Sequence, residues 1–177
     1  QKSIRILKEH IMSDSKSQTE LVVRPATIND TATIHQFVVD LAIYQKAEHE
    51  AKATEQDFVD TLFCEAPQAF ALIAQMGAEA VGFAIYFFSY STWLGKHGIY
   101  LEDLYVTPEC RGKGAGKALL QELAKIAVAK DCGRVEWSVL DWNEPSIQFY
   151  KSIGAEAKDG WTVYRLEDDT LTNFANS

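Results

Sequence analysis

The segment 106–119 constrains the fold of this chain more than any other, because an apolar strand leads through a glycine-rich turn directly into a helix. Arg111 opens the turn, which contains Gly112, Gly114 and Gly116. Glycines allow backbone N–H groups to converge on a ligand, and the helix that follows adds the positive end of its dipole. The segment therefore predicts an anion site, and the expected ligand is a pyrophosphate.

Spacing separates this turn from two other phosphate-binding loops. A P-loop has four residues between its glycines and then Lys with Ser or Thr, whereas three residues separate Gly112 from Gly116 and Ala118 follows Lys117. The dinucleotide pattern G-x-G-x-x-G would need glycine at position 117 or 119, where Lys117 and Leu119 stand. The pattern that remains is Arg-x-x-Gly-x-Gly, and a solvated glycine-rich turn is the alternative.

Length and composition favour a single domain. The chain has 177 residues, of which 47% are hydrophobic, so it can bury one sizeable core. We expect a flexible N-terminal extension over residues 1–20, one domain over residues 21–170 and a C-terminal tail over residues 171–177. The three cysteines are odd in number and show neither a C-x-x-C motif nor histidines at zinc spacing. No disulfide framework and no metal site are predicted, and a reducing cytoplasm is the expected compartment.

The charge pattern narrows the possible partners. A formal net charge of −8 argues against a nucleic-acid surface, which needs clustered Lys and Arg. No apolar run reaches the ~18 residues of a membrane span, so no membrane partner is expected. Residues 30–60 hold seven acids against two lysines, whereas the turn carries Arg111, Lys113 and Lys117. This division suits a cationic acceptor and an anionic cofactor, although a solvated helix face is the alternative for any single acid.

Hydrophobic periodicity predicts the element order β-α-α-β-β-β-α-β-α-β, which is an α/β fold with a mixed central sheet flanked by helices. We expect Gly133 to end the helix that starts at Gly114, and a loop over residues 89–98 to hold Trp93. Helices are also expected after Asn29 or Asp30, after Thr54 and from Glu144. Strands are expected over residues 21–24, 69–75, 80–90, 99–106, 134–140 and 160–167.

Two adjacent carboxylates, Glu102 and Asp103, interrupt the otherwise apolar strand over residues 99–106. Adjacent residues of a regular strand face opposite sides of the sheet, so at least one carboxylate must lie in an unusual environment. A buried carboxylate is costly unless it is paired or hydrogen-bonded. A catalytic or substrate-binding role therefore competes with a structural salt bridge.

A possible proton donor follows the next strand. Ser146 and Tyr150 are four residues apart in the segment 143–151, so one helical turn places them on the same face. A phenol with a pKa near ~10 can protonate the thiolate of a thiol whose pKa is near ~8.5. Core packing is the alternative role for Tyr150.

Together with the turn, several blocks of this sequence resemble the GNAT superfamily of N-acetyltransferases, and within it the diamine (spermidine/spermine) and thialysine N-acetyltransferases. The resemblance covers about residues 21–170. It implies a single GNAT-fold domain, acetyl-CoA as co-substrate, no metal and a homodimer. The blocks are VVRPAT from Val22, VGFA from Val81, WLGK from Trp93, YLED from Tyr100, the turn from Arg111 to Gly116, and WNEPSIQFYK from Trp142.

The resemblance also implies roles for individual residues. Glu102 would act on the amine as a base, through water, and Tyr150 would be the acid. Asp103 would bind the cationic chain, while Trp93 and Tyr44 would belong to the acceptor site. Leu104 and Val106 would offer backbone groups, and Asn143 would support the cofactor arm. The cofactor-binding residues would be Leu104, Tyr105, Val106, Arg111, Gly112, Lys113, Gly114, Ala115, Gly116 and Asn143.

The chain departs from the polyamine enzymes after Tyr44, where they carry an acid and this sequence has Gln45 and Lys46. Glu48 or Glu50 could replace that charge. We predict an N-acetyltransferase that moves acetyl from acetyl-CoA to a primary amine of a small polyamine by direct attack in a ternary complex. The alternatives are a lysine-like acceptor such as thialysine, a non-catalytic acetyl-CoA sensor and a protein-acetylating enzyme.

Overall fold

The computed structural model describes residues 20–177. They belong to two compact units, one ending at Ser138 and the other comprising Val139–Ser177. Apart from Glu20, the predicted N-terminal extension lies outside the described residues. No helix among the described residues is long and apolar enough to cross a membrane.

The first unit is built on one five-stranded sheet with the strand order β1-β2-β3-β4-β5. The first three neighbouring pairs are antiparallel, and β4 pairs with β5 in parallel, so the sheet is mixed, as predicted. The strands are β1 (Leu21–Pro25), β2 (Ala69–Met76), β3 (Glu79–Ser91), β4 (Lys96–Val106) and β5 (Val135–Trp137).

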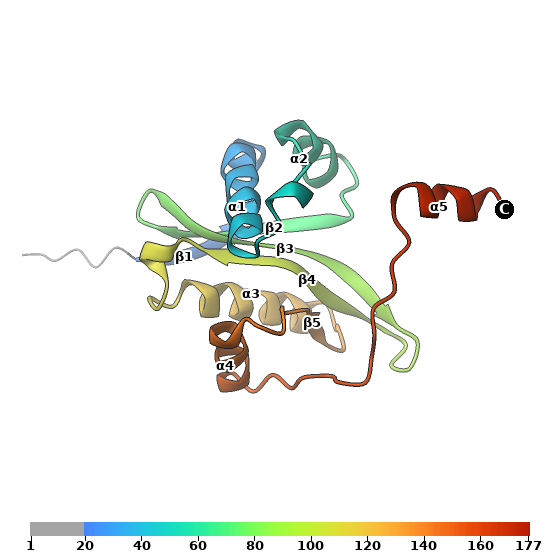
Figure 1. Cartoon of the computed structure of the whole chain (residues 1–177). Coiled ribbons are helices and arrows are strands. Elements are labelled where there is room, and N and C mark those ends of the chain that lie inside the picture. The colour runs from blue at the N-terminus through green and yellow to red at the C-terminus, as the bar shows by residue number, and fades with distance from the viewer. Residues whose placement is uncertain (1–19) are drawn as a thin grey trace, which may run out of the picture. The chain divides into compact units, whose positions relative to one another are not determined.

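Helices cover both faces of this sheet, with α1 and α2 on one face and α3 on the other (Figure 1). Short 3-10 turns precede α1, α2 and α3. The helices of the first unit are α1 (Thr31–Tyr44), α2 (Glu55–Leu62) and α3 (Ala115–Ala129), with the turns η1 (Ile28–Asp30), η2 (Glu48–Glu50) and η3 (Pro108–Cys110). The second unit contains α4 (Glu144–Ser152) and α5 (Asp168–Ala175).

The core beneath α1 and α2 explains why these helices form. Apolar residues of α1 recur at helical spacing and are buried, and the ring of Phe37 lies 5.6 Å from both Phe83 and Tyr105. The predicted capping box starts α2, because Asp57 accepts a hydrogen bond from the Thr54 N–H at 2.7 Å. On the other face, α3 buries Leu119 and Leu123.

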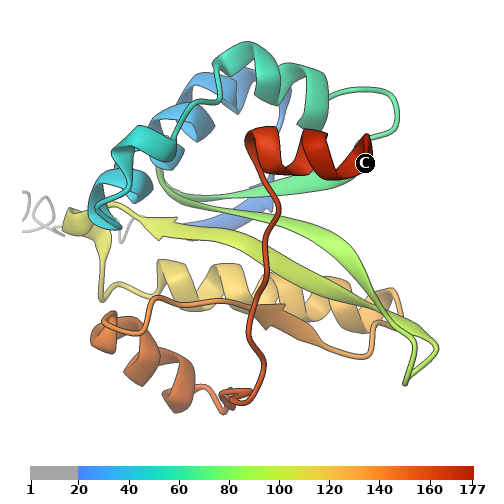
Figure 2. The ribbon, with the colours of Figure 1, turned by 45° about the vertical axis from the view of Figure 1, so that its right-hand side comes forward.

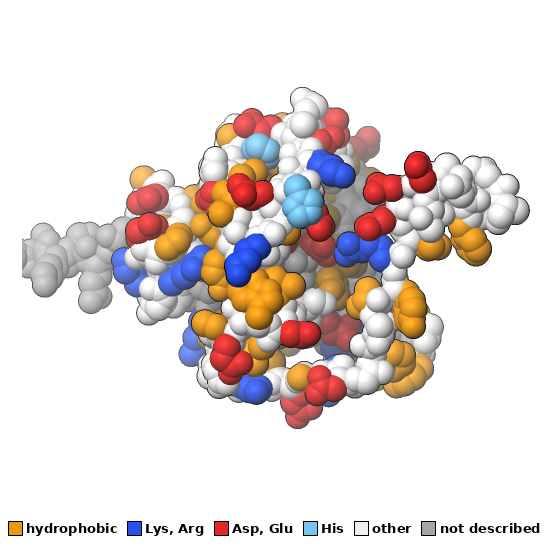
Figure 3. Space-filling model, viewed as in Figure 1, with side chains coloured by type: hydrophobic (Ala, Val, Ile, Leu, Met, Phe, Trp, Pro, Cys, Tyr) orange, Lys and Arg blue, Asp and Glu red, His pale blue; other side chains and the backbone are white. Residues whose placement is uncertain are grey.

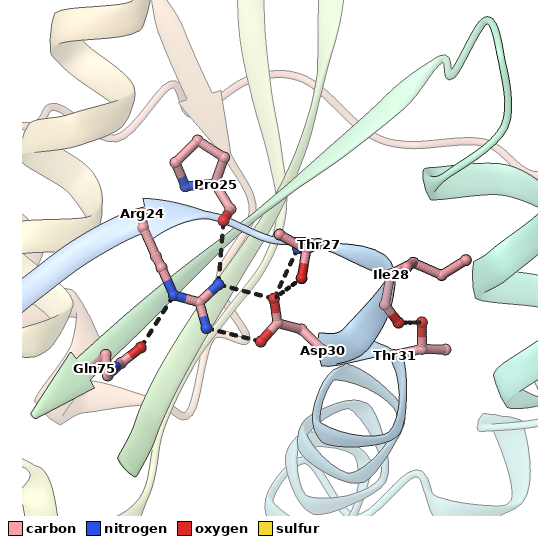
Figure 4. Close-up of polar contacts among 7 residues, drawn as sticks. All are labelled: Arg24, Pro25, Thr27, Ile28, Asp30, Thr31 and Gln75. Atoms are coloured by element: carbon pink, nitrogen blue, oxygen red, sulfur yellow. Dashed lines mark hydrogen bonds and ion pairs between the residues drawn. The ribbon is translucent and has the colours of Figure 1, made fainter. Parts of the chain in front are cut away.

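An ion pair joins β1 to the start of α1 (Figure 4). Arg24 donates to both carboxylate oxygens of Asp30, each at 2.8 Å, and its Nε donates to Gln75 at 3.0 Å. The Thr27 N–H also donates to Asp30, at 2.7 Å. These hydrogen bonds, chiefly those from Arg24, lower the pKa of Asp30 to about 2. Asp30 is therefore held as a charged, fully partnered carboxylate.

A β-bulge lies at the carboxylate pair of β4. Ile85 pairs with Asp103 and Tyr86 pairs with Leu101, which leaves Glu102 as an inserted residue without a partner on β3. Because Ile85 and Tyr86 face opposite sides of the sheet, so do Asp103 and Leu101, although they are two residues apart. The strict alternation expected of a regular strand therefore does not hold here. The insertion turns Asp103 to the face covered by α1 and α2, where its partner Ile85 lies in the core.

The last predicted strand is wrong. Residues 160–167 form neither helix nor strand, and α5 follows them over most of the predicted tail. The apolar side chains that suggested a strand are exposed, with Val163 at 83% and Tyr164 at 92%. Alternating apolar residues specify a strand only when a neighbouring edge pairs with it.

Three boundaries differ from the sequence prediction. The expected loop over residues 89–98 is mostly strand, because β3 and β4 form one long hairpin with its tip at residues 92–95. The strand expected over residues 134–140 is the shorter β5. Gly133 does not end α3, since the positive φ of 53° belongs to Asp131. Gly133 lies against Leu94 instead: a Cβ there would lie 2.6 Å from Leu94 Cδ1, so the end of this exposed side chain would have to shift.

Candidate active site

The glycine-rich turn leaves backbone N–H groups at the start of α3 without partners inside the helix. Gly112 and Gly114 have φ values of 73° and 92°, which are strained for residues with a Cβ. Gly114 is the N-cap of α3 and no side chain caps this helix, while Ala118 donates the first helical hydrogen bond, to the Gly114 carbonyl at 2.9 Å. The N–H groups of residues 115–117 precede that bond and are available to an anion.

A second row of backbone groups lies on β4. The Thr107 N–H donates to the Val81 carbonyl at 2.9 Å, which fixes the alternation of the antiparallel ladder. Leu104 and Val106 then direct their N–H and C=O groups away from β3. β5 pairs with β4 only as far as Leu101, so this stretch of the β4 edge has no partner strand in the described sheet.

The open edge of β4 and the turn are continuous along the chain, joined only by Thr107 and η3. The start of α3 packs close to the end of β4, since a Cβ on Gly116 would lie 3.8 Å from Val106 Cγ2. Lys113 and Lys117 are exposed beside the turn. This run of donors and cations fits an extended ligand with amide groups at one end and a diphosphate at the other.

The two carboxylates of the bulge differ in environment. Glu102 is exposed and Asp103 is partly buried. Burial, and after it the charge of Glu102, raises the pKa of Asp103 to about 6. Asp103 is therefore able to accept a proton near neutral pH, and it lies on the same face of β4 as Tyr105.

The side chain of Arg111 lies beside two tyrosines. Its guanidinium carbon lies 4.9 Å from the centre of the Tyr44 ring and 5.7 Å from that of Tyr105, and its Nε donates to the Val106 carbonyl at 3.0 Å. The turn after β4 and the end of α1 are therefore neighbours, as Figure 2 shows. The structure brings the predicted acceptor residue Tyr44 to the predicted cofactor residue Arg111.

Asp40 also acts on this cluster of Arg111, Tyr44 and Tyr105, and it was not among the site residues predicted from the sequence. Burial raises the pKa of Tyr105, and the charge of Asp40 raises it further. Asp40 lies one helical turn before Tyr44, and this i, i+4 spacing was the available signal. Acidic side chains lie at several points over α1 and α2 (Figure 3).

Three further predicted residues are described by their own surroundings, Trp93 in the first unit and Asn143 and Tyr150 in the second. Trp93 stands at the tip of the β3–β4 hairpin, 86% exposed. From the rise per residue, Lys96 at the start of β4 is already about 20 Å along the strand from Glu102, so the hairpin does not bring Trp93 and Glu102 together. Asn143 is buried and caps α4, accepting a hydrogen bond from the Ser146 N–H at 3.4 Å. Tyr150 is a half-buried residue of α4, with its ring 5.5 Å from that of Phe149.

No group of three or more His, Cys, Asp or Glu side chains among residues 20–177 has a geometry that could hold a metal ion.

Known proteins support one assignment for this arrangement. The acetyltransferase (GNAT) family model matches residues 31–155, and so includes parts of both compact units. The solved structure of an integron cassette protein from the mobile metagenome of V. cholerae is 28% identical, with a TM-score of 0.75 over 89% of this chain and 98% of that one.

Two relatives differ in the acceptor that their names give. A thialysine N-epsilon-acetyltransferase from Bos taurus is 34% identical over 166 residues, which is 88% of this chain and 97% of the relative. A spermidine/spermine N(1)-acetyltransferase-like protein from Homo sapiens is 32% identical over 163 residues, 86% of this chain and 23% of the relative. The chain belongs to the acetyltransferase (GNAT) family and is an acetyl-CoA-dependent N-acetyltransferase.

Proposed function

We propose that this enzyme acetylates the terminal primary amine of a small molecule that carries a second charged group, by direct attack within a ternary complex. The carboxylate pair of β4 carries this proposal. Asp103 and Glu102 lie on a strand whose open edge continues into the glycine-rich turn, so an amine held by the pair would lie next to a cofactor held along that edge.

The first step is deprotonation of the acceptor. An amine with a pKa near that of lysine, ~10.4, needs about 4–5 kcal/mol to become neutral at pH 7. Asp103, with its pKa near 6, accepts this proton directly or through water and Glu102. The neutral amine then attacks the acetyl carbonyl carbon of the acetyl-CoA thioester, so that the C–N bond forms and the C–S bond breaks. The second proton on the nitrogen is released to water as the amide forms.

Three further groups serve this reaction in our proposal. The backbone N–H groups of Leu104 and Val106 stabilise negative charge on the carbonyl oxygen or bind the cofactor's amide groups. The turn from Arg111 to Gly116 holds the pyrophosphate through its backbone. Tyr150 donates a proton to the departing thiolate, which leaves as the CoA thiol.

Two acceptors are compatible with this chemistry. A polyamine such as spermidine is favoured by the acids of residues 30–60. A lysine-like amino acid such as thialysine is favoured by Gln45 and Lys46, which stand where the polyamine enzymes have an acid, and by the name of the bovine relative. Both classes present a primary amine at the end of a short chain with a second amine further along.

A panel of amines tests the proposal. CoA release should be measured with spermidine, spermine, putrescine, thialysine, lysine and a lysine-containing peptide. We expect turnover with at least one small amine and little with the peptide. Preference for the peptide would indicate a protein-acetylating enzyme. CoA binding without turnover on any amine would indicate a non-catalytic sensor.

We also propose that the enzyme is a cytoplasmic homodimer. The three cysteines are free thiols, in keeping with a reducing compartment. Trp161 and Phe174 in the C-terminal segment are exposed at 79% and 68%, and apolar side chains so exposed are typical of a surface that a partner covers. Light scattering should give twice the chain mass, and Trp161→Asp should lower it. Cell fractionation tests the compartment.

A further inference from the structure

Arg111 presents an unused part of its guanidinium toward the end of α1. Its Nε is bonded to the Val106 carbonyl and its plane lies near the rings of Tyr44 and Tyr105. Among residues 20–177, no side chain or carbonyl accepts a hydrogen bond from its two terminal nitrogens. A guanidinium restrained in this way is a preformed fork for an anion.

We propose that Arg111 determines acceptor specificity by binding the carboxylate of an amino-acid acceptor. This inference rests on the proposed function, because it concerns the acceptor of the same reaction. The guanidinium lies over Tyr105, on the face of β4 that also holds Asp103, and Tyr44 belongs to α1 rather than to the turn. The side chain therefore extends to the acceptor side, while the backbone of the turn remains available to the pyrophosphate.

The distances suit an extended amino acid with a terminal amine. Asp103 and Tyr105 are two residues apart on one strand, so their side chains project about 7 Å apart. The carboxyl carbon and the terminal nitrogen of a lysine-like molecule are separated by six bonds, about 7 Å in an extended chain. The Arg111 guanidinium carbon lies 5.7 Å from the centre of the Tyr105 ring, so a molecule that extends along β4 from Asp103 past Tyr105 directs its carboxylate toward Arg111.

Asp40 supplies the remaining charge that such a molecule needs. Its carboxylate is close enough to raise the pKa of Tyr105, and it lies one helical turn before Tyr44. An amino acid carries an ammonium next to its carboxylate, and the charges of Asp40 and Arg111, which both act on Tyr105, complement that pair of opposite charges. A polyamine has no carboxylate and would meet Arg111 as a like charge, which disfavours it.

Matched acceptors test this inference. Lysine and cadaverine have the same chain and differ by the carboxylate, and thialysine can be compared with its decarboxylated diamine in the same way. We expect the wild type to favour the carboxylate-bearing member by about tenfold or more in kcat/KM. Arg111→Gln should bring this ratio close to one, and Arg111→Lys, which keeps the charge but loses the fork, should give an intermediate ratio.

Lys113→Gln is the matched control, because it removes a cation from the same turn. It should weaken CoA binding measured by calorimetry and lower kcat/KM for both members of a pair equally. If Arg111→Gln behaves in the same way, Arg111 serves the pyrophosphate and the inference is overturned. Circular dichroism checks that both variants are folded.

Failure of the inference differs from failure of the proposed function. A wild type that acetylates cadaverine as well as lysine overturns the role of Arg111 but leaves the N-acetyltransferase proposal intact. A wild type that acetylates no small amine overturns the proposed function. Calorimetric binding of lysine and cadaverine to the protein saturated with CoA then still decides the inference, because equal affinities would contradict it.

Discussion

Asp30 and Asp103 are two shielded carboxylates of the same unit with opposite properties. Asp30 accepts two hydrogen bonds from Arg24 and one from the Thr27 N–H, and its pKa is lowered to about 2. Asp103 has no hydrogen-bond partner among the described residues and a neighbouring like charge, and its pKa is raised to about 6. The first environment stabilises the fold, and the second prepares a group that can exchange a proton near neutral pH.

The two arginines of these regions differ in the same way. Arg24 uses all three guanidinium nitrogens for Asp30, Gln75 and the Pro25 carbonyl. Among the described residues, Arg111 donates a hydrogen bond only through its Nε, to the Val106 carbonyl. Arg24 and Asp30 thus hold β1 to the start of α1, whereas Asp103 and Arg111 keep unused hydrogen-bonding capacity on the face of β4 that α1 covers.

Replacing Asp103 should give the largest effect on turnover. Asp103→Asn removes the proton acceptor, so kcat/KM at pH 7 should fall about 10²–10³-fold. In the wild type, kcat/KM should rise with pH through about 6, where Asp103 loses its proton. This rising limb of the pH profile should be absent in the variant. A pH profile with the preferred amine measures both.

Glu102→Gln is the matched comparison for that result. The variant removes the like charge that contributes to the raised pKa of Asp103, so the limb should move to lower pH while turnover largely remains. If Glu102→Gln instead abolishes turnover and Asp103→Asn does not, Glu102 is the base. The raised pKa of Asp103, in contrast to that of Asp30, would then play no part in catalysis.

Replacing Gly114 should weaken cofactor binding by a somewhat smaller factor. Gly114→Asp places a Cβ at a φ of 92° and a negative charge at the start of α3. We expect the Kd for CoA to rise about 100-fold. Gly154→Asp is the control, because Gly154 has a similar φ of 87° with no atom within 4 Å of a Cβ. Calorimetry should give equal affinity for this control and the wild type.

Much of the scaffold was predictable because short-range patterns determine it. The capping box from Thr54 to Asp57, the periodicity of α1 and the Arg111–Gly116 turn each depend on residues close in sequence. The missing strand over residues 160–167 depends on pairing with a distant edge, which periodicity does not encode.

The charge distribution of the site was only partly predictable, for a related reason. Adjacent carboxylates on an apolar strand indicated that Glu102 and Asp103 were unusual. The bulge turns Asp103 to the face of the sheet that α1 covers. It arises from the register between β4 and β3, and no residue type in the sequence indicates it. The position of Arg111 beside Tyr44 joins residues 67 apart in the chain, so the sequence alone assigned this side chain to the turn.

Breaking the Asp30 ion pair should lower stability with little effect on chemistry. Asp30→Asn leaves Arg24 without its charged partner and should reduce the free energy of unfolding by about 2 kcal/mol at pH 7. Because the folded-state pKa of Asp30 is lowered, its contribution is present above pH 4 and is lost as the pH falls toward 2. Urea unfolding of wild type and variant at pH 7 and pH 3 should therefore give converging values.

The contribution of Asp103 to stability should change with pH in the opposite direction from that of Asp30. Its folded-state pKa is raised, so the folded state binds the extra proton and the wild type loses stability as the pH rises from 4 to 6. Asp103→Asn should be more stable than the wild type above pH 6, by about 1–2 kcal/mol. If the variant is less stable than the wild type at pH 7, Asp103 has a favourable partner and stabilises the fold as Asp30 does.

Arg24→Lys should give the smallest effect on stability. The variant shows what the several donors of the Arg24 guanidinium contribute beyond its positive charge. Lysine can keep one ion pair with Asp30 but cannot donate to both carboxylate oxygens and to Gln75 at once. We expect a loss of about 1 kcal/mol in the free energy of unfolding at pH 7, roughly half of that for Asp30→Asn. In the double variant with Asp30→Asn, the lysine substitution should have little further effect, because the two residues act through one contact. If the losses of unfolding free energy add in the double variant, Arg24 stabilises the fold mainly through its hydrogen bonds to Gln75 and Pro25. Arg24 would then differ from Arg111 in how many hydrogen bonds it makes, and its ion pair with Asp30 would matter little.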